Sequence, residues 1–511
     1  METSVLSFVC FSVFIALLST ALFRKRLQST PKKRPPSPWK LPIIGHLHHL
    51  KGAPPHHTLR RLSQKYGALI QLQLGEIPAI VVSSPRFAKE VLKTQDVTFA
   101  NRGEMLAGKI MLYNCTDIAC APYGEYWRQM RKICTLELLN TKNVRSYGSI
   151  RLQEAHSLIR SIKDLVGSST TINLTKELAE YTSSMVVRAA FGKVNKDDQD
   201  AFLELMKESL PLSSAFEISD LFPSLKFLHP FLSNKGELMR IHYKLDIVMD
   251  KIIDQYLDKD LASSKVASTS EQQQGNEDLI DVLLRVKDNN ELQFPITKNN
   301  IKAVMLDVFS GGTETSSSTV EWAMAELIRH PEVMAKLQDE IRESLGENKT
   351  IKESDIQELS YLKLVVKETL RLHPPAPLLV PRESRMQTEI DGYIIPNKTR
   401  VIVNAWAIAR DPEYWTDPES FKPERFENSG TDFTGNHFEY IPFGSGKRMC
   451  PGMSFGLANV YLPLALLLYY FDWKLPNGQK PDGLDMAETV GVTSSRSNHL
   501  LLIAKLYDPS L

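Results

Sequence analysis

Cysteine is scarce in this sequence of 511 residues. Only five are present, and their spacings show no regular pairing: Cys10, Cys115, Cys120, Cys134 and Cys450. An odd number of scattered cysteines in a long chain argues against a fold that depends on disulfide bonds. We therefore expect most of the chain to lie in a reducing compartment.

An excess of charge is also missing. The formal net charge is +1, whereas nucleic-acid-binding proteins usually carry a basic excess, so no nucleic-acid partner is expected. Internal repeats are absent too, which argues against a repeat architecture. What the chain does contain is 42% hydrophobic residues, enough for a large core.

Charged residues are absent from positions 3 to 23, a run long enough to cross a bilayer of ~30 Å as a helix. Arg24, Lys25 and Arg26 follow it, which places the rest of the chain in the cytosol. A cleaved signal peptide is the alternative, but the run is long and no basic segment precedes it. Residues 1–23 are therefore predicted to be a single transmembrane anchor. Glycan on any of four sequons would overturn this topology: Asn114, Asn173, Asn348 and Asn397.

The rest of the chain reads as a strut followed by one large body. Residues 24–45 are basic and proline-rich, which predicts a stiff, extended segment. In the body, residues 46–511, alternation predicts a hairpin over 71–84, and helical periodicity dominates the middle, as in 236–261 and 298–328. Residues 262–277 are predicted to be a surface loop, and 389–406 a strand region with its turn at Pro396-Asn397. The expected fold class is mainly α with small β-sheets (α+β).

The segment FGSGKRMCPG, residues 443–452, raises the question of chemistry. It is not a phosphate loop, because Arg448 follows Lys447 where Ser or Thr is needed and Ile441 stands at the first glycine position. A redox pair would need a second nearby cysteine, which is absent. A thiolate from Cys450 that binds an iron porphyrin fits best, because the neighbouring cations favour the ionised sulfur.

This pattern resembles the haem-binding signature of the cytochrome P450 family. Its positions here are Phe443, Gly446, Arg448, Cys450 and Gly452. The resemblance implies haem b, an iron protoporphyrin IX, with the thiolate of Cys450 as the axial metal ligand. It also implies contacts to the haem propionates from five side chains: Arg102, Trp127, Arg131, Arg382 and Arg448. Phe443 is implied to be a further haem-binding residue.

Two other motifs agree with this family. KETLR contains Glu368 and Arg371 on one helical face, and PERF contains Arg425. Alone, such a Glu-Arg pair is usually a solvated surface pair. The resemblance implies instead a buried structural network of all three that supports the cysteine loop.

The segment GGTETSS, residues 311–317, lies inside a predicted helix although these residues are poor helix formers. In isolation it would be an ordinary kink. The resemblance implies an oxygen-binding groove in which Glu314 and Thr315 are catalytic and deliver protons.

In WRQMRK, residues 127–132, Trp127 and Arg131 share one helical face, and Arg128 and Lys132 share the next. We hypothesise that Arg128, Lys132 and Lys447 dock an acidic reductase surface; a plain solvated face is the alternative. The implied electron source is NADPH, through an NADPH-cytochrome reductase, with a cytochrome b-type donor as a second candidate. The implied location is the endoplasmic reticulum membrane.

The motifs are most similar to those of the large plant microsomal clan that acts on terpenoids, alkaloids and phenolics. Hydroxylation of a sesquiterpene or diterpene skeleton is predicted, because the expected substrate walls are apolar. Alkaloid or flavonoid hydroxylation, hydroperoxide rearrangement and a non-enzymatic haem carrier are the alternatives; the last two would not need Glu314 and Thr315. The predicted walls are Val304, Val308, Gly311, Ala376, Leu378, Leu379, Val380, Val490 and Val492.

The histidine-rich run at residues 46–57 is not predicted to bind a metal. Metal ligands normally come from a fixed helix or hairpin, and this run contains prolines typical of a loop.

Overall fold

The computed structural model describes residues 33–511 except 167–170, 193, 210–211, 213–216, 226–232, 267–277, 289–294, 347–350, 490 and 508–511. The predicted anchor, residues 1–23, lies outside the described residues, as does the strut up to residue 32. In the described part, one helix is long and apolar enough to cross a membrane, Met453–Tyr470, but more than half of it is buried in the protein.

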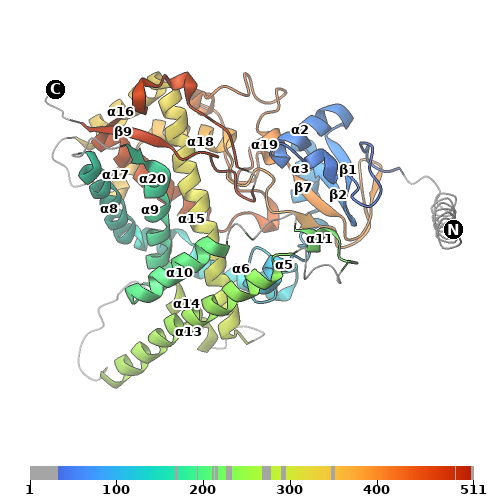
Figure 1. Ribbon diagram of the computed structural model, residues 1–511, viewed down its shortest axis with the longest axis horizontal. Coiled ribbons are helices and arrows are strands. Elements are labelled where there is room, and N and C mark those ends of the chain that lie inside the picture. The colour runs from blue at the N-terminus through green and yellow to red at the C-terminus, as the bar shows by residue number, and fades with distance from the viewer. Residues whose placement is uncertain are drawn as a thin grey trace, which may run out of the picture.

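The body is mainly helical with small sheets, as the sequence predicts (Figure 1). Helix α15 (Lys298–Arg329) runs through its middle, between a helical region and the main sheet. It packs most extensively on α9 (Leu174–Phe191) and on α20 (Met453–Tyr470). The other long helices are α2 (Pro55–Tyr66), α6 (Glu125–Ile133), α8 (Gly148–Val166), α10 (Lys196–Ser209), α13 (Lys235–Val266), α14 (Leu279–Asp288), α16 (Pro331–Leu345) and α18 (Ser360–Leu372).

The main sheet has four strands in the order β1-β2-β7-β4. Strands β1 (Leu69–Leu74) and β2 (Ile77–Val82) form the predicted hairpin. Strand β7 (Arg400–Val403) pairs parallel to β2, and β4 (Arg382–Glu383) pairs antiparallel to β7. A smaller sheet joins β3 (Ile172–Asn173), β9 (Leu501–Leu506) and β8 (Phe471–Lys474).

The predicted turn at Pro396-Asn397 is present, because residues 397 and 398 form a turn between the strands at 393–395 and 400–403, but a hairpin earlier in this region was not predicted. The hairpin joins β5 (Thr388–Ile390) to β6 (Tyr393–Ile395), and its turn is Asp391-Gly392, both at positive φ. The turn forms at this point because Gly392 has no Cβ and therefore adopts a φ of 76° without steric strain. Pro396-Asn397 instead leads the chain from β6 to β7 in the other sheet.

Two other boundaries refine the predictions. Helix α13 continues to Val266, so the predicted loop at 262–277 begins later than expected, and its remainder lies outside the described residues.

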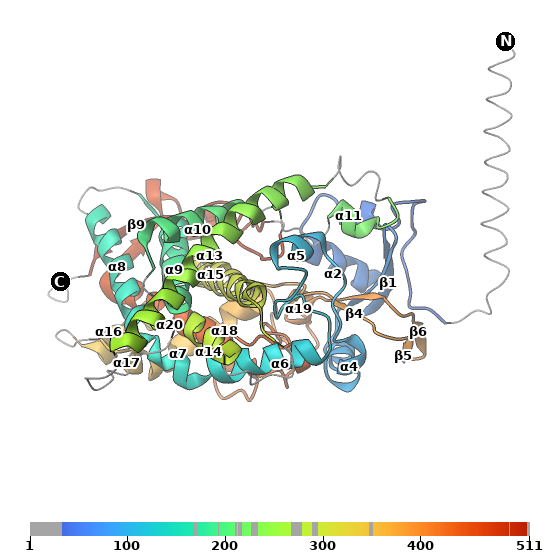
Figure 2. The ribbon, with the colours of Figure 1, turned by 90° about the horizontal axis from the view of Figure 1, so that it is seen from below.

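The described part of the strut packs against the sheets: Gln71 N donates to Pro36 O at 2.8 Å and Ile394 N to Lys33 O at 2.9 Å. Figure 2 shows this N-terminal segment at the same end of the molecule as β5 and β6.

Candidate active site

The loop before α20 holds Cys450 in a fixed position. Gly444 and Gly446 have φ of 70° and 72°, and a Cβ at Gly446 would lie 2.0 Å from the carbonyl oxygen of Leu92. Only glycine fits there. The backbone N–H of Cys450 donates to Phe443 O at 3.0 Å, which closes the loop around the sulfur.

The thiol of Cys450 opens onto an internal cavity of about 300 Å³. Burial raises its pKa, while the backbone N–H of Gly452 and the charge of Arg131 act in the opposite direction. Arg131 lines the same cavity and donates to Met449 O, beside the cysteine. The loop therefore offers the sulfur both a donor and a nearby positive charge, which favour a thiolate ligand.

Three arginines meet at this cavity: Arg102 and Arg382, which are buried, and Arg448, which is partly buried. Within the described chain only Arg382 has a carboxylate within 4 Å, Asp96 at 2.7 Å. Burial and mutual repulsion lower the pKa of Arg448 to about 8 and that of Arg102 to about 10. A cluster of cations with so little compensating charge suits an anionic occupant.

The residues present therefore fit a haem. A cysteine thiolate would bind its iron, the three arginines would bind its propionates, and the apolar walls would surround the ring. The arginines are also held ready by backbone carbonyls: Arg102 donates to Val380 O at 2.6 Å and to Ala119 O at 2.8 Å. Their side chains thus stay extended towards the cavity.

Trp127 is placed behind this cluster rather than along the cavity. Its ring is buried and its Nε1 donates to Ile118 O at 2.9 Å. The guanidinium of Arg448 lies 4.2 Å from the ring centroid. Trp127 therefore supports an arginine of the cavity through a cation–π contact. Phe443 lines the cavity.

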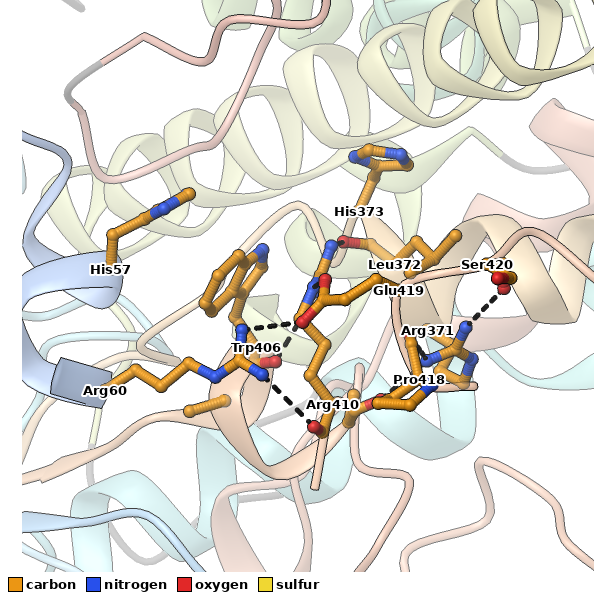
Figure 3. Close-up of polar contacts among 12 residues, drawn as sticks. His57, Arg60, Arg371, Leu372, His373, Trp406, Arg410, Pro418, Glu419 and Ser420 are labelled. Carbon is orange, nitrogen blue, oxygen red and sulfur yellow. Dashed lines mark hydrogen bonds and ion pairs between the residues drawn. The ribbon is translucent and has the colours of Figure 1, made fainter. Parts of the chain in front are cut away.

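The structure brings Glu368, Arg371 and Arg425 together. Arg371 Nε and Arg425 Nε lie 2.8 and 2.9 Å from the carboxylate of Glu368, and Glu368 and Arg371 are fully buried. Arg371 also donates to Pro418 O and Ser420 O (Figure 3). The network thus fastens α18 to the segment that leads to the cysteine loop.

Figure 3 shows a second set of contacts beside this network, which the sequence did not reveal. Arg410 donates to Leu372 O at 2.6 Å and pairs with Glu419, and its guanidinium lies 4.0 Å from the ring of Trp406. Arg60 of α2 also pairs with Glu419, at 2.7 Å. These contacts join α2 to the same segment.

Helix α15 contributes Gly311, Gly312 and Thr315 to the cavity wall. Thr315 Oγ1 donates to Gly311 O at 2.6 Å, and a Cβ at Gly312 would lie 3.1 Å from Val186 of α9. The helix is continuous here, so no break accompanies the glycines. Glu314 points elsewhere: its carboxylate is not part of the cavity wall and accepts a hydrogen bond from Thr493 Oγ1 at 3.2 Å.

Five of the predicted substrate-wall residues line the cavity: Val308, Gly311, Ala376, Leu379 and Val380.

The other four predicted wall residues do not line this cavity in the described structure. Val304 is fully buried in the core formed with α9, α13 and α14, because it lies nearly two turns before Gly311. Leu378 packs on the apolar side of the sheet instead. Val492 is 48% exposed, and Val490 lies outside the described residues.

Asp307 is a cavity residue that the sequence reasoning missed. It lies four residues before Gly311, so helical periodicity was an available signal. Its carboxylate accepts from the backbone N–H groups of Ile118 and Ala119 at 3.1 and 3.0 Å, and burial raises its pKa to about 7. Asp307 thus holds one edge of the cavity against α15. Other missed wall residues are Leu92, Leu139, Pro375, Val401, Val403 and Phe455.

The histidine-rich run is arranged differently from the loop assumed above. His56 and His57 lie in the first turn of α2, and their Nε2 atoms are 2.5 and 3.2 Å from Glu488 Oε2. These three residues have the number and closeness of ligand atoms that a metal site needs. Each atom already has a partner within the group, so we interpret the cluster as hydrogen bonds to the Glu488 carboxylate that tie the C-terminal loop to α2.

Of the hypothesised docking cations, Arg128 of α6 is 52% exposed and pairs with Glu125. Lys132 and Lys447 are exposed.

Comparisons with known proteins agree with the haem site that this geometry indicates. Residues 35–502 match the family described as Cytochrome P450. Premnaspirodiene oxygenase of Hyoscyamus muticus is 54% identical over 501 residues, which are 98% of each chain. Germacrene A hydroxylase of Helianthus annuus is 52% identical over 498 residues, 97% of this chain and 99% of that protein. Desmethyl-deoxy-podophyllotoxin synthase of Sinopodophyllum hexandrum is 51% identical over 499 residues, 98% of this chain and 97% of that protein.

Proposed function

The chain belongs to the cytochrome P450 family and is an oxygen-dependent monooxygenase, and from that premise we propose that it hydroxylates a small terpenoid hydrocarbon, a sesquiterpene in the first place. The observation that carries the proposal is that Cys450 lines the same cavity as Gly311, Gly312 and Thr315 of α15.

The division of labour follows from the residues. A bound haem supplies the oxygen activation, with an electron-rich thiolate that favours O–O cleavage. Arg102, Arg382 and Arg448 would bind and orient its propionates, and the hydrogen bond from the Gly452 N–H would lower the negative charge on the sulfur. Thr315, in the wall of the cavity, holds a hydroxyl where a proton is needed, and Glu314 beside it is the candidate proton source.

The substrate walls support a hydrocarbon. Val308, Ala376, Leu379 and Val380 contribute only apolar side-chain atoms to the cavity, which excludes water and favours an apolar ligand. Relatives named premnaspirodiene oxygenase and germacrene A hydroxylase share more than half of their residues with this chain.

A second candidate substrate class has an observation in its favour. The relative named desmethyl-deoxy-podophyllotoxin synthase is almost as similar, at 51% identity. Asp307 adds one carboxyl group to the cavity wall, which a polar substrate group would contact. Podophyllotoxin-type phenolics therefore belong in any substrate panel, together with alkaloids and flavonoids.

Electrons are proposed to come from NADPH through a membrane-bound reductase. Arg128, Lys132 and Lys447 are the candidate docking cations, and all three are solvent-exposed. The uncharged run at residues 3–23 and the basic residues after it support a single-pass anchor in the endoplasmic reticulum with the body in the cytosol.

The test is turnover by microsomes that contain this protein and a plant reductase. The microsomes are given sesquiterpene and diterpene olefins, podophyllotoxin-type phenolics, alkaloids and flavonoids, with and without NADPH. We expect NADPH-dependent alcohol products from sesquiterpene olefins. Conversion of the phenolics or alkaloids alone would contradict the terpenoid assignment, and equal turnover without NADPH would contradict the proposed electron source.

A further inference from the structure

The contact between Glu314 and Thr493 joins two parts of the chain that are 179 residues apart. Thr493 lies in the C-terminal loop enclosed by the β-bridge between Glu488 and Arg496. Its hydroxyl donates to Glu314 Oε2 at 3.2 Å. Thr315, the next residue of α15, lines the cavity instead. Of the expected catalytic pair, Glu314 therefore points its carboxyl group to the C-terminal loop, whereas Thr315 faces the cavity.

The carboxyl group of Glu314 depends on this one hydroxyl. Burial raises its pKa, and the hydrogen bond from Thr493 is the interaction that lowers it. Among the described residues no charged side chain contributes to this shift. An ionised carboxylate that leaves water needs hydrogen-bond donors, and here one neutral donor supplies that support.

The loop that presents Thr493 is itself firmly attached. Ser494 N donates to Pro375 O at 2.9 Å, and Ser494 O accepts from Trp322 Nε1 at 3.1 Å. Trp322 is a fully buried residue of α15, so the loop is fastened to the same helix that carries Glu314. The hydrogen bonds of Glu488 with His56 and His57 hold the start of the loop. The position of the Thr493 hydroxyl is therefore fixed relative to α15.

We propose that Thr493 is a positioning residue for proton delivery: its hydroxyl holds the carboxyl group of Glu314 beside the C-terminal loop, one residue away from Thr315. From there the side chain of Glu314 reaches the cavity by rotation about its own bonds. In each cycle the carboxyl group gives up one proton and takes one back from water, so it is not consumed. This role rests on the monooxygenase function proposed above.

The test compares Thr493→Val with Thr493→Ser and with Thr489→Val. Valine keeps the shape and removes the donor, whereas serine keeps the donor. Thr489 is the matched control, because its hydroxyl bonds to Ser495 O in the same loop and does not contact Glu314. Product formed per NADPH consumed is measured in microsomes, at equal amounts of haem protein. We expect Thr493→Val to lose about fivefold to tenfold in this ratio, the factor that corresponds to one lost hydrogen bond, and the other two variants to match the wild type.

The pH profile separates positioning from a structural effect. Removal of the donor raises the pKa of Glu314 further, because the ionised form loses its support. The protonated fraction falls as the pH rises through that pKa, and product per NADPH falls with it. In Thr493→Val this decline should therefore move to higher pH, by about 0.5 to 1 unit. Thr493→Ser should keep the wild-type profile.

A double variant provides the remaining control. In a Glu314→Gln background, Thr493→Val should have no additional effect, because the glutamine amide delivers no proton and its position therefore no longer matters for coupling. Multiplying effects would contradict the proposal, as would wild-type coupling and pH profile in Thr493→Val, or an equal loss in Thr489→Val. If Thr493→Val binds no haem, Thr493→Ala is held to the same outcomes. A wild-type enzyme with no product from any compound would overturn the proposed function as well. If the wild type and Thr493→Val form the same amount of product per NADPH, only the role of Thr493 is overturned.

Discussion

The two sides of the cavity are built in different ways. The side that presents Cys450 is held by backbone hydrogen bonds, glycines and three arginines, each with its own carbonyl partners. The substrate side consists mainly of apolar side chains such as Val308 and Leu379, and other apolar residues of similar size could take their place. The first side therefore tolerates few substitutions and keeps one cofactor, whereas the second is free to change its substrate.

The largest effect is expected from the network that supports the cysteine side. Glu368→Ala leaves Arg371 charged and buried without its carboxylate, which should lower the free energy of unfolding by about 3–5 kcal/mol. Chemical denaturation measures this change. The control is Glu180→Ala, whose exposed pair with Lys176 should be worth less than about 1 kcal/mol. Equal losses in both variants would show that the buried network has no special role.

The next effect concerns the boundary between the two sides. Thr315→Val removes the hydroxyl in the cavity wall and should reduce product per NADPH by about 10-fold or more, with hydrogen peroxide released instead. Thr313→Val is the control, because its hydroxyl bonds to Phe309 O in the same helix and does not line the cavity. Full coupling in Thr315→Val would remove this residue from proton delivery.

These two predictions concern residues that the sequence already indicates. The hairpin at β1 and β2, helix α15 and the cysteine loop follow from local patterns: alternation, periodicity and glycines in a fixed motif. Thr493, Asp307 and the pair of His56 with Glu488 were not found, because their partners come from distant parts of the chain and only the folded structure brings them together. Val304 shows the opposite error, since a shared helical face does not decide which neighbour the face meets.

A smaller effect is expected on the substrate side. Ala376→Val adds two methyl groups to the cavity wall and should change the ratio of hydroxylated products by about 10-fold, while haem content stays unchanged. Leu378→Val is the comparison, because Leu378 packs against the sheet and should affect stability without changing the ratio. Product ratios from one olefin, measured by gas chromatography, decide between them. If only Leu378→Val altered the product ratio, Leu378 rather than Ala376 would be the residue that contacts the substrate.

The smallest effect is expected at the surface. The double variant Arg128→Glu, Lys132→Glu should raise the reductase concentration needed for half-maximal turnover by about 3-fold to 10-fold, and this difference should shrink at high salt. Arg240→Glu, an exposed cation of α13, should leave that concentration unchanged. Unchanged turnover of the double variant at limiting reductase would exclude these cations from docking.

The central claim is that the sulfur of residue 450 binds the iron of a haem in this cavity. The most direct measurement is the absorption spectrum of reduced, carbon-monoxide-bound membranes from the wild type and from Cys450→Ala, with immunoblots showing equal protein. The wild type should show the red-shifted Soret band of a thiolate-ligated haem, and the variant should lack it and form no product. A wild-type preparation without that band, or a Cys450→Ala protein that still oxidises its substrate, would contradict the account.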